Sequence, residues 1–196
     1  MLHSVINSVN TGKIPSKVKW KEFINETIQD YMFAMWRFEL CLFSKLSLFR
    51  VIVTRLEPIY WWVMVRNNPY LKKPCVTLVR LLCGTSVLAQ HANVNVPRNE
   101  RVCQLCNSNS IEDIFHFVME CPFFDINRLI LFRIIEQNIS DVSKHVWRQL
   151  GMYMKLYVIM GMDYPLIPEE DIGIIRFHSC LTIHQMYKAR RLYEPP

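Results

Sequence analysis

Glycine is scarce in this sequence, with only five residues among 196. Hydrophobic residues make up 51% of the chain and charged residues 20%, and no repeat or low-complexity tract occurs. That balance is typical of a globular protein and excludes a disordered chain. Few glycines, with Leu, Ile, Phe and Met spread over most of the length, predict a mainly α-helical fold. A chain of this length buries about two thirds of its unfolded surface, so it need not depend on disulfides.

Long hydrophobic runs are missing as well. The most apolar short stretch, PIYWWVMV at 58–65, is far below the ~20 residues that a membrane-spanning helix needs. The segment 81–97 lacks Lys, Arg, Asp and Glu, but Gln90, His91 and other polar residues interrupt it. The first ten residues have no apolar core of the kind that a signal peptide needs. We therefore expect no membrane segment and an intracellular location, nuclear or cytoplasmic.

The charge is moderately basic, with a formal net charge of +6. Such an excess favours an acidic partner such as RNA or DNA, although an ordinary soluble basic protein fits the charge equally well. Residues 1–20 read as a flexible basic arm and 21–196 as a helical domain. Lysines around Trp20 suit a phosphate backbone with the indole stacked on a base, and a solvated arm without a partner is the alternative. The expected phosphate contacts are Lys13, Lys17, Lys19, Lys21, Lys72, Lys73 and Arg101.

Apolar residues recur at helical spacing over much of the chain. The pattern predicts helices over 20–53 with a break near Ser44, 74–82, 124–138, 141–152 and 169–193. The stretch 58–66 reads as a strand or a fully buried helix, with Trp61 and Trp62 in the core. In 124–138 the expected apolar face is Ile126, Leu129, Ile130, Phe132 and Ile135. The last helix begins with acidic and ends with basic residues, which complements the helix dipole.

Seven cysteines are present, and three of them gather in RVCQLCNSNSIEDIFHFVMEC at 101–121. A C-x2-C turn supplies Cys103 and Cys106, and an H-x4-C ending supplies His116 and Cys121. Structural zinc takes four such ligands in a tetrahedron, so the spacing predicts a Cys3His zinc knuckle within 101–122. Buried cysteines with a core histidine are the alternative. Four protein ligands leave no open position for water, which favours a structural Zn2+ over a catalytic one.

The short helix of this knuckle is expected to start at Ile111, with Ser110 and Asp113 as a capping pair. Glu112 and Asp113 then read as charges at the helix N-terminus rather than as catalytic groups. A second cluster, His178, Cys180 and His184, has no pairing turn, so packing is the default and a metal the alternative. The remaining cysteines read as core residues: Cys41, Cys75 and Cys83.

The segment ERVCQLCNSNSIEDIFHFVMECPFF resembles the zinc-knuckle-like region near the C-terminus of reverse transcriptases from non-LTR (LINE-type) retrotransposons of invertebrates such as molluscs. That pattern joins a C-x2-C pair, E-D or E-T before H-F, and a C-P or C-x-x-F ending. The matching positions are Cys103, Cys106, Glu112, Asp113, His116, Phe117, Cys121 and Pro122. Upstream, SKLSLFRVI at 44–52 and LVRLLCG at 78–84 resemble two further segments of the same tails.

The resemblance covers roughly residues 35–150. Departures from the pattern are Leu82 in place of an arginine, Ser47 in place of a basic residue, and ANVN at 92–95. No Tyr/Phe-x-Asp-Asp polymerase motif occurs, and no room remains for an endonuclease domain. The resemblance therefore implies a non-catalytic, zinc-binding tail that binds template RNA or target DNA, with no small-molecule substrate. The alternatives are a structural or protein-interaction zinc module, and a non-functional remnant of a mobile element.

Overall fold

The computed structural model describes residue 12 and residues 16–54, 60–93 and 95–193. They fall into two compact units, one within residues 1–42 and one within residues 43–196. The fold is mainly α-helical, as predicted, and the only β pairing among the described residues is a single bridge between Val102 and Ile111. None of the described helices is both long enough and apolar enough to span a lipid bilayer.

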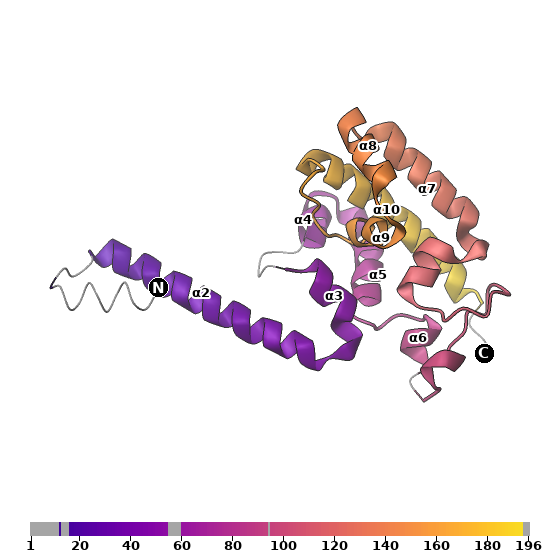
Figure 1. Cartoon of the computed structure of the whole chain (residues 1–196), viewed down its shortest axis with the longest axis horizontal. Helices are drawn as coiled ribbons and strands as arrows, with labels where there is room; N and C mark the ends of the chain where they lie inside the picture. Colours follow the sequence, from indigo (N-terminus) through magenta and orange to yellow (C-terminus); the bar gives the residue numbers. More distant parts are fainter. Residues whose placement is uncertain (1–11, 13–15, 55–59, 94, 194–196) are drawn as a thin grey trace. The chain divides into compact units, whose positions relative to one another are not determined.

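The first unit is built on one helix, α2, which runs from Lys17 to Leu42 (Figure 1). The predicted flexible basic arm, residues 1–20, overlaps this helix, because α2 already includes Lys17 and Lys19. Lys13 lies outside the described residues. The predicted break near Ser44 is confirmed, since α2 ends at Leu42 and a short 3-10 turn follows.

The second unit contains the remaining helices. Its α-helices are α3 (Ser47–Ile52), α4 (Tyr60–Asn67), α5 (Lys72–Leu82), α6 (Ala89–Ala92), α7 (Asp125–Asn138), α8 (Asp141–Gln149), α9 (Met152–Ile159) and α10 (Glu169–Arg191). Single 3-10 turns occupy Ser44–Leu46, Pro69–Leu71, Arg98–Glu100 and Pro122–Phe124, and a π-helical turn occupies His116–Glu120.

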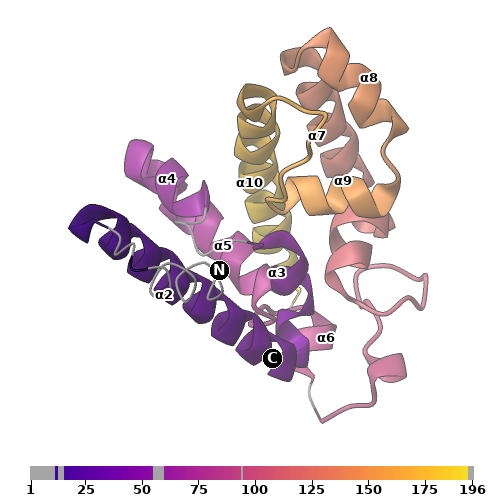
Figure 2. The same cartoon turned by 60° about the vertical axis from the view of Figure 1, so that its left-hand side comes forward.

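Helix α10 forms the centre of this unit and packs against α5, α7 and α9 (Figure 2). Its inward face carries Ile175, Cys180 and Ile183, none of which is exposed to solvent. Fully buried leucines of α5 lie in one helix that packs on α10, and the buried Leu156, Val158 and Ile159 lie in another, α9. Burial of apolar side chains along one long helix is what holds the shorter helices in place.

Two predicted helices differ in detail from the structure. The 58–66 stretch is helical from Tyr60 onward, so the strand alternative is wrong, and Trp61 is buried whereas Trp62 is 67% exposed. Trp61 lies against Gly161. A Cβ at position 161 would lie 2.7 Å from the Trp61 indole, which explains why this position is a glycine. The predicted helix 141–152 ends at Gln149, because Leu150 and Gly151 take extended conformations, and α9 starts at Met152.

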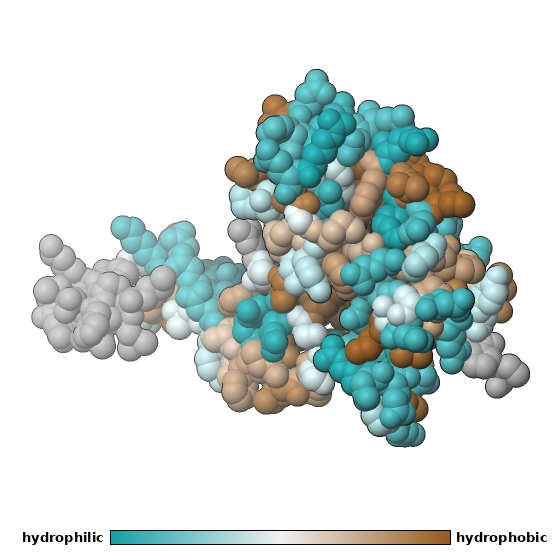
Figure 3. Space-filling model, turned by 45° about the vertical axis from the view of Figure 1, so that its right-hand side comes forward, coloured by the Kyte–Doolittle hydropathy of each residue, from teal (hydrophilic) through white to brown (hydrophobic). Residues whose placement is uncertain are grey.

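The buried face of α7 matches the prediction only in part. Ile135 is buried as predicted and Phe132 is half-buried. Ile126, Leu129 and Ile130 are exposed instead, whereas Arg128 and Leu131 are buried. Apolar patches separated by hydrophilic residues are visible on the face drawn in Figure 3.

The start of α10 is fixed to the start of α8 by Asp171. Its carboxylate accepts hydrogen bonds from the Ser140 hydroxyl and the Ser143 hydroxyl, both at 2.6 Å, and from the Ser140 N–H at 3.2 Å. Burial acts to raise the pKa of Asp171, but these hydrogen bonds outweigh it and leave the pKa below its usual value. Ser140 is also the N-cap of α8, since its hydroxyl accepts the Ser143 N–H.

Replacing Asp171 by asparagine should lower the free energy of unfolding by about 1–3 kcal/mol near neutral pH. Because the folded pKa is depressed, this stabilisation is fully present above the unfolded value, about 3.9, and is lost as pH falls through the folded pKa. Urea titrations from neutral to acidic pH should show a constant difference in the free energy of unfolding between the parent protein and the variant. That difference should disappear below about pH 4. A gap that widens on acidification would contradict this assignment.

Candidate metal centre

The C-x2-C pair lies in a short antiparallel hairpin. The Cys103 N–H donates to the Ser110 carbonyl at 2.8 Å, and the Glu112 N–H donates to the Arg101 carbonyl at 2.9 Å. The chain reverses within NSNS at 107–110, where Asn109 adopts a positive φ of 52°, a conformation that asparagine tolerates better than most residues. The hairpin thereby places the two thiols of one tight turn at its tip.

The helix that carries His116 begins later than predicted. Ile111 belongs to the hairpin bridge rather than to a helix, so the predicted start at Ile111 with Ser110 as cap is wrong. Asp113 is the cap instead, because its Oδ1 accepts the His116 N–H at 2.8 Å. The Ser110 carbonyl is already used by the Cys103 N–H, which explains why the chain is still extended there.

A π-helical turn brings His116 and Cys121 to one side. In an α-helix, residues five apart point about 140° away from each other. Over His116–Glu120 the chain widens to a π turn, closed by the Cys121 N–H donating to the His116 carbonyl at 2.7 Å. An i to i+5 hydrogen bond places residue i+5 nearly above residue i, and such single turns are frequent at functional sites. The H-x4-C spacing therefore suits a π turn, which places His116 and Cys121 on the same side of the chain.

Arg128 of α7 holds the end of this turn. Its guanidinium donates to the Val118 carbonyl at 3.1 Å and to the Cys121 carbonyl at 3.2 Å, and it also pairs with Asp125. The last carbonyls of a helical turn have no partners within it, so a buried arginine that satisfies them has a reason to be buried. This accounts for the face of α7 that hydrophobic spacing alone predicts incorrectly.

The four predicted ligands come together. The Sγ atoms of the three cysteines and a ring nitrogen of His116 all lie within 4.8 Å of one another. Cys103 Sγ lies 3.9 Å from Cys121 Sγ, and Cys106 Sγ lies 3.3 Å from His116 Nε2. A tetrahedral ion with bonds of about 2.3 Å to sulfur separates two sulfurs by ~3.8 Å. The cluster therefore has the spacing that a bound metal ion requires.

Three of the four candidate ligands are buried. Cys103, His116 and Cys121 are each at most 5% exposed, and Cys106 is half-buried. The Cys121 thiol shares its proton with Cys103, which lowers the pKa of Cys103 to about 4 and raises that of Cys121. Backbone N–H groups two residues further on, at Leu105 and Phe123, also lower these two pKa values. Both N–H groups favour thiolates, the form that binds metal.

His116 presents its two ring nitrogens to different surroundings. Nε2 faces the cysteines, while Nδ1 lies 3.9 Å from a carboxylate oxygen of Glu120 and makes no hydrogen bond within the described residues. Metal-bound histidines usually donate from the second nitrogen to a carboxylate or carbonyl, which fixes the ring. Glu120, one turn away and largely exposed, is the group placed to take that role.

Glu112 anchors the hairpin to the end of α10. It is completely buried, accepts the Ala89 N–H at 2.7 Å and forms an ion pair with Arg190, in which Nη2 lies 3.0 Å from Oε2. The expectation that Glu112 is a helix N-terminal charge is wrong. Arg190 does lie in the basic last turn of α10, as predicted for that helix end, and it is also held by this buried ion pair. The two residues are 78 positions apart, and no sequence pattern links them.

The remaining cysteines and histidines lie elsewhere. Cys180 Sγ is 3.7 Å from Cys75 Sγ, and His184 Nδ1 bonds the Thr77 hydroxyl at 2.8 Å. The packing interpretation of that second cluster therefore fits, and the knuckle is the one Cys/His group among the described residues that could hold a metal. Cys41 is exposed, so its assignment to the core is wrong.

The predicted phosphate contacts occupy different surroundings. Lys17, Lys19 and Lys21 are exposed on α2. Lys72 and Lys73 are exposed side by side at the start of α5. The Arg101 guanidinium donates to the Val96 carbonyl at 2.8 Å and the Gln90 carbonyl at 2.9 Å, so it also holds the loop before the hairpin.

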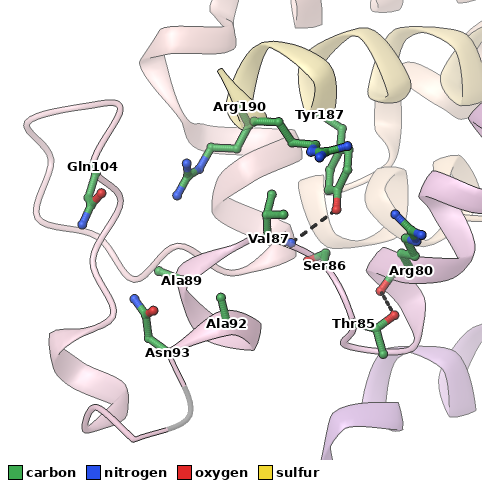
Figure 4. A pocket seen from close by; sticks show the side chains of 11 residues that line it. Arg80, Thr85, Ser86, Val87, Ala89, Ala92, Asn93, Gln104, Tyr187 and Arg190 are labelled. Carbon is green, nitrogen blue, oxygen red and sulfur yellow. Dashed lines mark hydrogen bonds between the residues drawn. The ribbon is translucent and has the colours of Figure 1, made fainter. Parts of the chain in front are cut away.

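A basic cavity, which sequence reasoning missed, opens beside the C-x2-C turn. It measures about 450 Å³ and is bordered by Gln104 of the turn, the α6 segment and the last turn of α10 (Figure 4). Three arginines line it: Arg80, Arg190 and Arg191. The Tyr187 hydroxyl accepts the Val87 N–H at 3.3 Å at its base. Helix ends far apart in sequence create this cavity, so no local motif reveals it.

Fold and cluster together define a mainly helical protein with a candidate Cys3His metal centre. None of the protein-family models, curated proteins or solved structures compared with this chain matches it. The resemblance to retrotransposon reverse-transcriptase tails consequently remains a prediction from the knuckle sequence.

Proposed function

We propose that Cys103, Cys106, His116 and Cys121 hold a structural Zn2+. The observation that carries this proposal is the convergence of three sulfurs and one imidazole nitrogen within 4.8 Å from a hairpin and a π turn. Thiolate and imidazole ligands select zinc among the common divalent ions, and four protein ligands close its coordination. A closed site stabilises a fold and leaves no position for a reacting water, so the protein is proposed to be non-catalytic.

The ion would join two segments of the chain. Cys103 and Cys106 belong to the hairpin, whereas His116 and Cys121 belong to the turn that leads into α7. Arg128 and Glu112 then connect this pair of segments to α7 and α10. Zinc bound here would thus fix the position of the hairpin tip, including Gln104, relative to the helical core.

We further propose that the zinc-held surface binds single-stranded RNA or DNA. The specific support is the cavity beside the knuckle, where Arg80 and Arg191 are exposed and Gln104 and Asn93 add polar side chains. Glu112 balances the charge of Arg190, so two arginine charges in the lining are left for an anionic ligand. Phosphates are the usual partners of clustered arginines, and a cavity of this size admits a phosphate with its sugar.

The double variant Arg80→Ala/Arg191→Ala should bind labelled single-stranded RNA or DNA about tenfold more weakly than the parent protein. Fluorescence anisotropy between about 50 and 200 mM salt should also show a shallower dependence of the binding constant on salt, because fewer counterions are released. Arg133→Ala, an exposed arginine on α7, is the matched control and should bind like the parent. Zinc-loaded protein that binds neither nucleic acid, or binds without salt dependence, would favour the structural or protein-interaction alternative.

A further inference from the structure

Helix α2 carries an exposed apolar stripe that runs its length. Six side chains, each 38% to 65% exposed, follow one another at spacings of four, three, four, three and four residues: Ile24, Ile28, Tyr31, Met35, Phe38 and Leu42. A 4-3 alternation places all six along one line of a helix that is slightly underwound to 3.5 residues per turn. The helix, 26 residues long, extends about 39 Å. The apolar stripe is therefore a continuous seam rather than scattered apolar positions.

We propose that the apolar stripe pairs with the same stripe of a second copy of this chain, in an antiparallel coiled coil. The size of the seam suits a second copy. We take about 180–250 Å² as the area of each of these large side chains. The exposed area of the six residues, together with that of the flanking Trp20 and Met32, is then roughly 800 Å² per helix. A stable protein–protein interface buries about that area on each partner.

The charges on either side of the stripe also suit a second copy. The positions that flank a coiled-coil seam are Trp20, Asn25, Thr27, Met32, Ala34, Glu39 and Cys41. Glu39 is the single charged residue among them, so two copies would meet without repulsion along the flanks. Charged residues of the middle of α2, such as Glu22 and Asp30, lie off the seam.

The lysines at the start of α2 favour an antiparallel over a parallel arrangement of the two helices. Continued toward the N-terminus, the 4-3 spacing places Lys21 and Lys17 on the seam. A parallel pair would hold each lysine against its counterpart, whereas an antiparallel pair separates the two sets by the length of the helix. Antiparallel helices also align their dipoles favourably. In the register that sets Ile24 opposite Leu42 and Ile28 opposite Phe38, Thr27 of one copy faces Cys41 of the other.

Sedimentation equilibrium on the full chain tests the pairing. The parent protein should have twice the chain mass of 23.4 kDa. Ile28→Lys should halve that mass, because it places a charge in the seam, while Gln29→Lys, the same charge one residue away on an exposed position off the seam, should remain dimeric. Circular dichroism should show both variants as helical as the parent. A monomeric parent, or loss of the dimer in both variants, would overturn the proposal.

The direction has its own test. A short bismaleimide crosslinker applied to the Thr27→Cys variant should join position 27 of one copy to Cys41 of the other, as identified by peptide mass spectrometry. A dominant link between the two copies of position 27 would show a parallel pair and overturn the antiparallel arrangement. A monomeric parent that binds anionic phospholipid vesicles through α2, with binding lost in Ile28→Lys, would assign the stripe to a membrane surface instead and overturn the pairing.

Discussion

Purified protein should contain one zinc per chain, and Cys103→Ser and His116→Ala should each reduce it to well below one. Both ligands are almost fully buried in the cluster, and each comes from a different segment. Binding of structural zinc contributes about 10–16 kcal/mol in small zinc modules, which rivals the entire stability of a typical domain. We therefore expect the melting temperature of either variant to fall by at least about 10 °C. Chelation of the parent protein should produce the same fall.

Cys41→Ser and Cys83→Ser are the matched controls, since neither cysteine belongs to the cluster. Both should keep one zinc and a near-parental melting temperature. Hydrogen exchange would localise the effect: loss of the ion should expose amides of the hairpin and of the π turn first, with α5 and α10 protected longer. If the parent protein folded equally well with and without zinc, the proposed structural role would be wrong. If the His116→Ala variant still contained one zinc per chain, His116 would not be a ligand.

The sequence predicts the ligands of the candidate site well because their chemistry is local. A C-x2-C pair and an H-x4-C ending are short-range patterns, and the structure brings all four side chains together. What holds them together is short-range too, but it acts on backbone groups that ligand spacing does not specify. The π turn, the cap at Asp113 and the buried Arg128 depend on particular carbonyls and N–H groups between residues 113 and 128. Spacing predicts which residues converge, but not the backbone that makes them converge.

Helix positions were predictable and helix faces less so. The predicted helix over 124–138 matches α7, but its buried face carries Arg128 because the preceding turn needs a donor. Hydrophobic periodicity assumes that apolar residues point inward. That assumption fails where a polar group must satisfy a buried carbonyl, and here the failure lies directly beside the candidate metal centre. Hydrophobic spacing likewise does not predict the extended backbone at Leu150 and Gly151 that separates α8 from α9.

Removal of one partner of the buried ion pair of Glu112 and Arg190 should be strongly destabilising. Glu112→Ala should lower the free energy of unfolding by about 3–5 kcal/mol, because it leaves the Arg190 charge buried without its carboxylate and the Ala89 N–H without an acceptor. Arg190→Ala should cost a similar amount by burying an uncompensated carboxylate. The double variant Glu112→Gln/Arg190→Met should cost clearly less than the two single losses together, since no charge is then buried alone.

The exposed pair of Glu136 and Arg148 gives the matched comparison. It has good geometry, with a 2.7 Å contact, but Arg148 is 64% exposed, and its removal should cost less than about 1 kcal/mol. Urea unfolding of all the variants provides the free energies. The zinc content of each variant shows whether the metal and the ion pair with α10 stabilise the hairpin independently. Glu112→Ala should retain one zinc, because no ligand is changed, yet lose the attachment of the hairpin to α10. If that variant lost its zinc as well, metal binding and docking onto α10 would be one cooperative event rather than two independent contributions.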